Sequence, residues 1–306
     1  MEFIEVVFFE NIFPFKEERH NDSGSKRKYE ASSSEGQVGQ EIEVEPRRSK
    51  RAKKTTSFGP NFLTYMVEDE PQTFNEAMAS SDAPYWKEAV NSEMESIMQN
   101  QTWVLVNLPP GSKPIGCKWI FKRKLKADGT IEKYKARRVA KGYRQKEGQD
   151  FFDTYSPVTR ITSIRMLIAI AALHNLEIHQ MDVKTAFLNG DLEEEVYMEQ
   201  PEGFVVKGHE KKVCKLIKSL YGLKQAPKQW HEKFDHTMLE NGFKINECDK
   251  CVYVKIINHE CVVVCLYVDD MLIMGTNRSV IESTKKMLNS NFDMKDLSLD
   301  GVILGI

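Results

Sequence analysis

The chain has 306 residues, of which 41% are hydrophobic, so it is long enough to form about two domains with a substantial core. No apolar run approaches the roughly 18 residues of a membrane-spanning helix, and the first residues lack the charge pattern of a signal peptide. The six cysteines of this long chain do not indicate a secreted disulfide scaffold. These exclusions predict an intracellular, cytoplasmic protein with no membrane partner.

The formal net charge of −2 conceals one strongly basic segment. Between Lys118 and Lys146 there are twelve Lys or Arg residues and two acids, a local excess of ten positive charges. Acidic residues elsewhere cancel this excess in the total. Such a concentration of positive charge favours a polyanionic partner such as a nucleic acid.

The first 72 residues differ in character from the rest of the chain. Residues 3–9 have the pattern of a short strand, whereas 16–60 are dominated by Ser, Glu, Lys and Gly. Because they offer so little to bury, residues 16–72 are expected to form a disordered linker. The basic run at 47–54 is consistent with nuclear import or with a nucleic-acid-binding arm. A solvated charge run in a tether is the plainer interpretation, and we prefer it.

Folded character begins near residue 73. Asp82, Ala83 and Pro84 resemble a helix start, because proline is tolerated in the first helical turn. Residues 127–130 give a turn signal between two alternating segments, which predicts a hairpin. In chain order, the expected elements are strands 102–108, 116–125 and 131–140, a helix at 158–174, a strand at 177–183, a helix at 226–241, strands 252–257, 261–268 and 271–275, and a helix at 279–291.

The order of these elements favours an α+β fold. Strands and helices do not alternate regularly, and no glycine-rich phosphate loop follows a strand. A doubly wound nucleotide-binding fold is therefore not expected.

Carboxylates interrupt two apolar stretches of the sequence. Asp269 and Asp270 follow an apolar run that begins at Val262, and apolar residues resume at Met271. Placing two charges between buried strands is costly unless they lie in a turn or bind cations. An ordinary acidic hairpin turn is one explanation, although Asp-Asp without Gly or Asn makes a poor tight turn. Asp182 ends another apolar strand in the same way.

Together the three carboxylates suggest a site for two divalent metal ions. Nucleotidyl transfer to a 3′-hydroxyl uses two cations about 3.5–4 Å apart, held by hard oxygen ligands. One cation lowers the pKa of the attacking hydroxyl, and the other neutralises the leaving pyrophosphate. Two Mg²⁺ ions are the expected cofactors, with Mn²⁺ as a substitute. On this hypothesis Asp182, Asp269 and Asp270 converge on one small patch.

Several segments resemble motifs of the reverse transcriptases of copia-type LTR retrotransposons, and they occur in the same order along the chain. The segment QMDVKTAFLNG at 180–190 resembles the first catalytic motif of that family, and YVDD at 267–270 resembles the second. The other matching segments, in the order of the family, are YKARRVAKG at 134–142, YSPV at 155–158, VYMEQPEGF at 196–204 and SLYGLKQAP at 219–227. The resemblance covers about residues 75–306.

This resemblance implies a right-hand polymerase whose fingers and palm subdomains span residues 73–306. The implied activity is RNA-directed DNA polymerisation, with dNTPs and an RNA or DNA primer–template as substrates. Asp182, Asp269 and Asp270 would be the catalytic metal ligands.

The resemblance also implies a set of dNTP-binding residues. Phe187 falls at the aromatic gate under the deoxyribose, although plain core packing is the alternative. Lys135 and Arg137 share one face of the basic hairpin and would hold the triphosphate, unless that face is merely solvated. Tyr221 and Gly222 belong to the same site, where the glycine would allow close backbone approach beside the template base.

Further roles follow from the resemblance near the chain ends. Lys295 resembles the lysine that protonates pyrophosphate, and Leu304 and Gly305 resemble the start of the primer grip. Residues 1–15 resemble the tail of an integrase region. The thumb and RNase H that follow this point in the family are expected to be missing. We therefore expect a polyprotein fragment that binds nucleic acid and extends a primer poorly or not at all.

One departure from the family pattern supports a second hypothesis. Arg138 stands where the family usually carries an apolar residue, most often Leu. On a half-buried strand this is costly if the side chain cannot reach solvent. The second hypothesis is a catalytically impaired nucleic-acid-binding remnant of a degenerate element, whereas the intact aspartates favour an enzyme.

The cysteine spacing superficially suggests zinc. Cys248, Cys251, Cys261 and Cys265 would supply four ligands. However, Cys261 and Cys265 lie within a continuous Val-rich strand, whereas a zinc knuckle needs a Gly-bearing turn between paired ligands. Buried free cysteines are the commoner outcome, so no structural zinc is expected.

Overall fold

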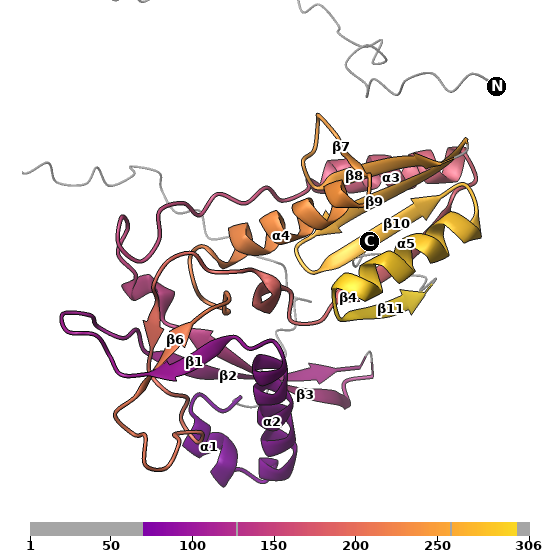
Figure 1. The fold of residues 1–306 in the computed structure, drawn as a ribbon. Helices are drawn as coiled ribbons and strands as arrows, with labels where there is room; N and C mark the ends of the chain where they lie inside the picture. The colour runs from indigo at the N-terminus through magenta and orange to yellow at the C-terminus, as the bar shows by residue number, and fades with distance from the viewer. Residues whose placement is uncertain (1–69, 127, 258, 299–306) are drawn as a thin grey trace, which may run out of the picture. The chain divides into compact units, whose positions relative to one another are not determined.

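The structure is a computed structural model (Figure 1). It describes residues 70–126, 128–257 and 259–298, all within the compact unit Glu68–Ile306. The features of the sequence that lie outside the described residues are the integrase-like segment 1–15, the linker up to residue 69 with its basic run at 47–54, and Leu304 and Gly305.

The larger sheet has six strands, all paired antiparallel. In spatial order they are β11 (Met294–Ser298), β4 (Glu177–Val183), β10 (Asp270–Gly275), β9 (Glu260–Tyr267), β8 (Val252–Ile257) and β7 (Lys244–Ile245). The central strands alternate, so Met181, Met271 and Val264 all project to one face and are buried there.

Helices α4 (Ala226–Glu240) and α5 (Arg278–Asn291) cover that face. On α4, buried Trp230, Phe234 and Met238 recur at helical spacing, and they join one core cluster with Ile281 and Leu288 of α5. Helix α3 (Ile161–Leu173) precedes β4 in the chain. None of the helices in the described part of the chain is long and apolar enough to cross a membrane.

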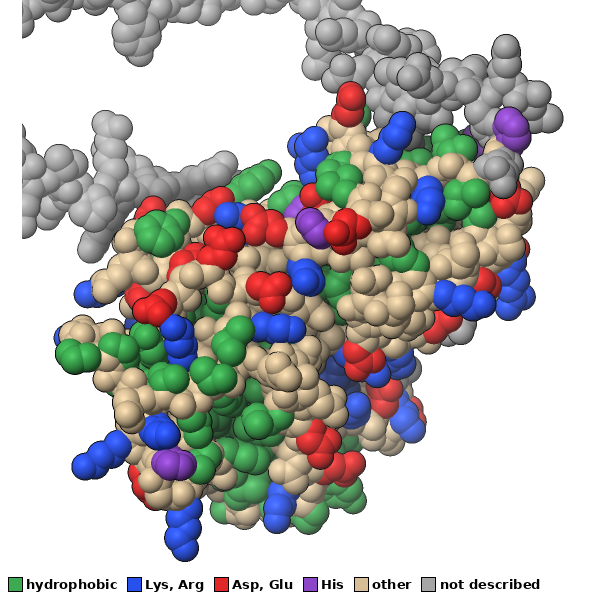
Figure 2. All heavy atoms as spheres, in the orientation of Figure 1, with side chains coloured by type: hydrophobic (Ala, Val, Ile, Leu, Met, Phe, Trp, Pro, Cys, Tyr) green, Lys and Arg blue, Asp and Glu red, His purple; other side chains and the backbone are tan. Residues whose placement is uncertain are grey.

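The remaining elements form a second group around a smaller sheet. Its strand order is β1 (Trp103–Val106), β6 (Val213–Leu216) and β5 (Tyr197–Met198). Beside it lie the hairpin of β2 (Cys117–Leu125) and β3 (Ile131–Ala140) and the helices α1 (Phe74–Ala79) and α2 (Ala83–Gln99). Figure 2 shows hydrophobic side chains at the surface over the smaller sheet, and Val104 of β1 is 45% exposed.

The hairpin has one apolar and one basic face. The apolar face carries Trp119 and Phe121, which pack against Trp86 of α2 in a buried cluster. At the turn, the carboxylate of Asp128 accepts hydrogen bonds from the backbone N–H and the hydroxyl of Thr130, at 2.9 and 2.6 Å. This local pairing is the turn chemistry that Asp favours.

Most predicted elements are confirmed. Strands 131–140, 177–183 and 252–257 have the predicted bounds. The helix predicted from residue 158 begins only at Ile161, because Arg160 is in an extended conformation. Helix α1 and strands β5, β6, β7 and β11 are absent from the predicted elements.

The Arg138 side chain does not reach solvent. It is 2% exposed, and its Nε has no hydrogen-bond partner among the described residues. The guanidinium contacts the Cys117 thiol and lies 5.3 Å from the centre of the Trp119 ring. Burial, the largest cause, lowers the pKa of Arg138, which reflects the cost of holding this charge away from water.

We predict that Arg138→Leu raises the free energy of unfolding by about 1–3 kcal/mol, because an apolar side chain needs no solvation in this place. Urea denaturation measures the change. Lys118→Leu, an exposed position on the neighbouring strand, serves as the control and should change stability by less than about 0.5 kcal/mol. A loss of stability in Arg138→Leu would show that the guanidinium contacts outweigh its burial.

Candidate active site

Three aspartates lie together at the end of the central strands. In the β4–β10 ladder Asp270 stands directly opposite Asp182. The Val183 amide donates to the Asp269 carbonyl at 2.9 Å, so the pairing with β4 extends to the residue just before β10. Gln180 Nε2 donates to Asp270 Oδ1 at 3.3 Å. The antiparallel register thus brings together carboxylates that are almost 90 residues apart in the sequence.

The tight turn between β9 and β10 presents Asp269. Its two loop residues are Val268 and Asp269, since Tyr267 pairs with Asp270. Val268 has a φ of 62°, in the left-handed region that β-branched residues avoid. The indole N–H of Trp230 donates to the Val268 carbonyl at 2.7 Å. Helix α4 therefore holds a strained turn beside the aspartates.

The electrostatics of this patch disfavour ionised carboxylates. Burial raises the pKa of Asp182, and the neighbouring Asp269 raises it further, while Lys135, Lys124 and Lys295 act in the opposite direction. The pKa of Asp270 is also raised, chiefly by burial and also by the other two aspartates. These carboxylates repel one another across a partly desolvated site. A cation placed between them would relieve both effects.

The basic face of the hairpin supplies cations from the other group of elements. On this face Lys122 stands opposite Lys135, and Lys124 opposite Lys133. Like charges directly opposite in a ladder are destabilising. Burial lowers the pKa of Lys135, and so do Lys124, Arg137 and Lys133, whereas Asp182 raises it. The hairpin thus turns crowded positive charge toward the aspartates.

An aromatic stack links the hairpin to the motif that follows β4. The Arg137 guanidinium lies 4.4 Å from the centre of the Tyr221 ring. The rings of Tyr221 and Phe187 meet edge to face with centres 5.1 Å apart. Burial raises the pKa of Tyr221 to about 12, so its hydroxyl stays protonated. Phe187 is partly buried and packs against two core clusters. It therefore contributes to core packing, which the sequence analysis gave as the alternative to an aromatic gate.

Gly222 has a φ of +91°, and its missing side chain makes room for β3. A Cβ there would lie 2.2 Å from the Ala140 carbonyl oxygen and 2.6 Å from Val139 Cγ1. The Ala140 amide donates to the Tyr221 carbonyl at 2.7 Å. The close approach that the glycine allows is therefore to strand β3, and it fixes Tyr221 against the hairpin.

Lys295 lies on the edge strand β11, directly opposite Asp182 in the β4–β11 ladder. Its positive charge is one of those that lower the pKa of Asp182. The other described site residues therefore lie near the three aspartates or at the basic face of the hairpin; they are Lys135, Arg137, Phe187, Tyr221, Gly222 and Lys295. Leu304 and Gly305 are not described.

The structure adds neighbours of the site that sequence patterns missed. Trp230 is recognisable as a core residue of α4, but its hydrogen bond to the Val268 carbonyl depends on a contact between distant segments. The same holds for Gln180, which bonds Asp270. Lys124 was counted only as part of the basic segment, and its charge acts on both Asp182 and Asp270.

The cysteines of the larger sheet are free. Burial raises the pKa of Cys251 to about 12 and that of Cys265 to about 11, so both remain thiols at neutral pH. Within the ranges that the structure describes, no group of three His, Cys, Asp or Glu residues is arranged to hold a metal ion by itself.

We predict that Trp230→Phe lowers the free energy of unfolding by about 1–3 kcal/mol and accelerates amide exchange in the turn, because the Val268 carbonyl loses its donor. Hydrogen–deuterium exchange and urea denaturation measure both effects. Trp86→Phe is a matched control, since the Trp86 indole N–H is buried without a hydrogen-bond partner among the described residues. Equal exchange in the turn of both variants would contradict the role assigned to the indole.

Comparison with known proteins identifies the family of this chain. A family model described as reverse transcriptase (RNA-dependent DNA polymerase) matches residues 100–306. The retrovirus-related Pol polyprotein from transposon TNT 1-94 of Nicotiana tabacum is 46% identical over 85% of this chain, which spans 20% of that polyprotein. The one from transposon RE1 of Arabidopsis thaliana is 41% identical over 80% of the chain, which spans 16% of it.

A more distant relative is the Gag-Pol polyprotein of transposon Ty1-NL2 of Saccharomyces cerevisiae, 28% identical over 86% of the chain, which spans 15% of it. The chain thus covers a fifth or less of each of these relatives. The chain belongs to the reverse transcriptase (RNA-dependent DNA polymerase) family, in the group carried by copia-type retrotransposon Pol polyproteins.

Proposed function

We propose that this chain carries the polymerase centre of an RNA-directed DNA polymerase, which adds a nucleotide from a dNTP to the 3′-hydroxyl of a primer on an RNA or DNA template. One observation carries the proposal: Asp182, Asp269 and Asp270 adjoin one another at the end of the central strands and face a wall of positive charge. A site with several carboxylates near several lysines suits a metal-bound triphosphate, because the carboxylates can bind the metal ions and the lysines can bind the phosphates.

The donor chemistry of the site fits two Mg²⁺ ions, with Mn²⁺ as a substitute. Mg²⁺ is usually held by one or two carboxylates together with water and substrate phosphates, so a protein cage of three ligands is not required. Burial and the neighbouring aspartates raise the pKa of Asp182 and of Asp270, and a bound cation would favour the ionised carboxylates. When bound, the ions would activate the primer hydroxyl and neutralise the pyrophosphate.

The side chains around the aspartates would bind and orient the dNTP. Lys135 and Arg137 would hold the triphosphate, because they lie on the basic face of the hairpin. Tyr221 and Phe187 would form an apolar wall beside the sugar, and the position of Phe187 suits a gate against a 2′-hydroxyl. Lys295, opposite Asp182, is the candidate general acid that donates a proton to the leaving pyrophosphate.

The two groups of elements suit the subdomains of a right-hand polymerase. We assign the six-stranded sheet with α4 and α5 to the palm, because it carries the three aspartates. The hairpin β2–β3 with α1 and α2 would be the fingers, because it presents the basic face. Figure 1 shows the free end of this hairpin on the same side as β4 and β11.

We predict that Asp269→Asn lowers primer extension by more than about a hundredfold, because a neutral amide is a much weaker ligand than a carboxylate for the divalent cations that the site would hold. Extension of a labelled primer on an RNA template, with dNTPs and Mg²⁺, measures the change. Asp293→Asn is the control, since that carboxylate is 69% exposed and pairs only with Lys184 among the described residues. Extension that survives Asp269→Asn would remove the catalytic assignment and favour a nucleic-acid-binding remnant.

A further inference from the structure

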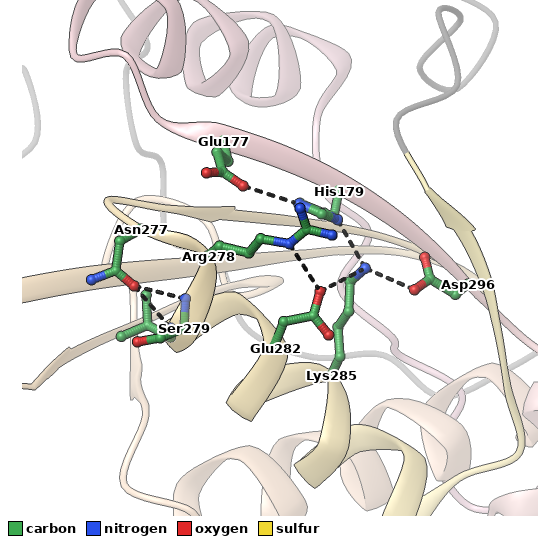
Figure 3. A network of polar contacts seen from close by, with 9 residues as sticks. Glu177, His179, Asn277, Arg278, Ser279, Glu282, Lys285 and Asp296 are labelled. Atoms are coloured by element: carbon green, nitrogen blue, oxygen red, sulfur yellow. Dashed lines mark hydrogen bonds and ion pairs between the residues drawn. The ribbon is translucent and has the colours of Figure 1, made fainter.

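A buried lysine on α5 contacts two strands of the larger sheet. Lys285 is 4% exposed. Its Nζ lies 2.8 Å from Asp296 Oδ2 on β11 and 2.8 Å from His179 Nδ1 on β4 (Figure 3). Glu282, one turn earlier on α5, is 4.0 Å from the same nitrogen. One ammonium group therefore joins a helix to the two strands that carry Lys295 and Asp182.

The chemistry of these contacts fixes the state of His179. An ammonium group has three N–H donors and no acceptor, so Nδ1 of His179 must accept the hydrogen bond. The ring proton is then on Nε2, which faces the Glu177 carboxylate at 3.5 Å. His179 is 5% exposed and lies on the helix-covered face, away from the aspartate site. His179 thus ties β4 to Lys285.

Strand β11 is an edge strand that pairs with β4, and Met294 at its start is buried in the core cluster. Its ladder with β4 pairs Met294 with Val183, Lys295 with Asp182 and Asp296 with Met181, and then the register shifts. Lys295 and Asp296 are adjacent and project to opposite faces of the sheet. The bond from Lys285 to Asp296 therefore acts one residue away from the lysine that faces Asp182.

An apolar residue at 285 would fill the same space without fixing Asp296. Buried ion pairs are weak evidence for stability, and their best-attested use is to specify one register over others. The alternatives here are slipped positions of an edge strand. A slip of one residue would turn Lys295 away from Asp182, because side chains alternate between faces.

We infer that Lys285 is a positioning residue: through Asp296 and His179 it holds β11 in register on β4, so that Lys295 stays opposite Asp182. The consequence for catalysis rests on the proposed function, in which Lys295 donates a proton. The effect on the register of β11 does not rest on it.

Hydrogen–deuterium exchange of the full chain tests the effect on the register. Asp296→Asn should accelerate exchange of the β11 amides at least about tenfold, while β9 amides serve as the internal reference for folding. Asp293→Asn is the matched control, because its pair with Lys184 also joins the β4 and β11 segments, but Lys184 is 53% exposed whereas Lys285 is buried. It should change exchange less than about twofold. Equal effects of the two variants, or no change in β11, would overturn the inference.

A second variant guards against loss of folding. Lys285→Met combined with Asp296→Leu replaces the pair by apolar side chains; position 285 is buried, and position 296 is 46% exposed. It should keep the slow exchange of β9 and still exchange rapidly in β11. Slow exchange in β11 of this variant would mean that packing alone holds the strand, and would overturn the inference.

Primer extension tests the route through Lys295. Asp296→Asn should lower kcat at least about tenfold with little change in KM for the dNTP, as Lys295→Met should. In a Lys295→Met background, Asp296→Asn should have no further effect on kcat. Additive losses would overturn the route through Lys295. If extension by the chain alone is too weak to measure, the same variants are compared with a family-type thumb and RNase H segment appended; no activity in that protein would contradict the proposed function, and the exchange measurement would decide the positioning role.

Discussion

The crowding of aspartates at the end of the central strands is the constraint on which the site depends. The antiparallel register of β4 and β10 sets Asp182 against Asp270, and the tight turn adds Asp269. Burial and mutual repulsion raise the pKa of Asp182 and of Asp270, so the fold holds them at a cost in free energy. Such a cost is characteristic of sites that bind cations and reactive phosphates.

The surrounding elements supply what holds this arrangement. The Trp230 indole fixes the strained Val268 carbonyl from the helix side, and Gln180 bonds Asp270 from β4. The hairpin opposes the aspartates with lysines that repel one another across their own ladder. The like charges within the aspartate group and within the lysine group each repel one another. The two groups have opposite charges and therefore attract each other. A metal–nucleotide complex, which carries both signs of charge, would satisfy both groups.

The sequence predicts those strands and helices whose residues show a clear local pattern. The strand at 177–183 and the hairpin strand at 131–140 were predictable because alternation and turn residues specify them locally. Strands β5 and β7 have two residues each, too short for any periodicity to show. The edge strand β11 depends on its pairing with β4 and on the contact to α5, so the sequence around it carries no strand signal.

For the candidate site, the sequence indicates the motif residues but not the residues that support them. Asp182, Asp269 and Asp270 interrupt apolar runs, and this pattern can be recognised in the amino-acid sequence. The bond from Trp230 to the Val268 carbonyl and the contact of Lys285 with His179 join segments 38 and 106 residues apart. The close backbone approach at Gly222 is to strand β3, and its place beside a template base stays a prediction. Only packing in three dimensions decides such neighbours.

By this reasoning, the crowded aspartates oppose folding until a cation binds. An acid whose pKa is raised in the folded state destabilises the fold once it ionises, so this penalty is absent below the ordinary value of 3.8 and complete above the raised value. Thermal unfolding at pH 7 of the wild type and Asp182→Asn, with and without Mg²⁺, measures it. Without Mg²⁺ the variant should melt at the higher temperature, and Mg²⁺ should raise the melting temperature of the wild type much more. A variant that melts lower without Mg²⁺, or equal stabilisation of both proteins by Mg²⁺, would contradict the account.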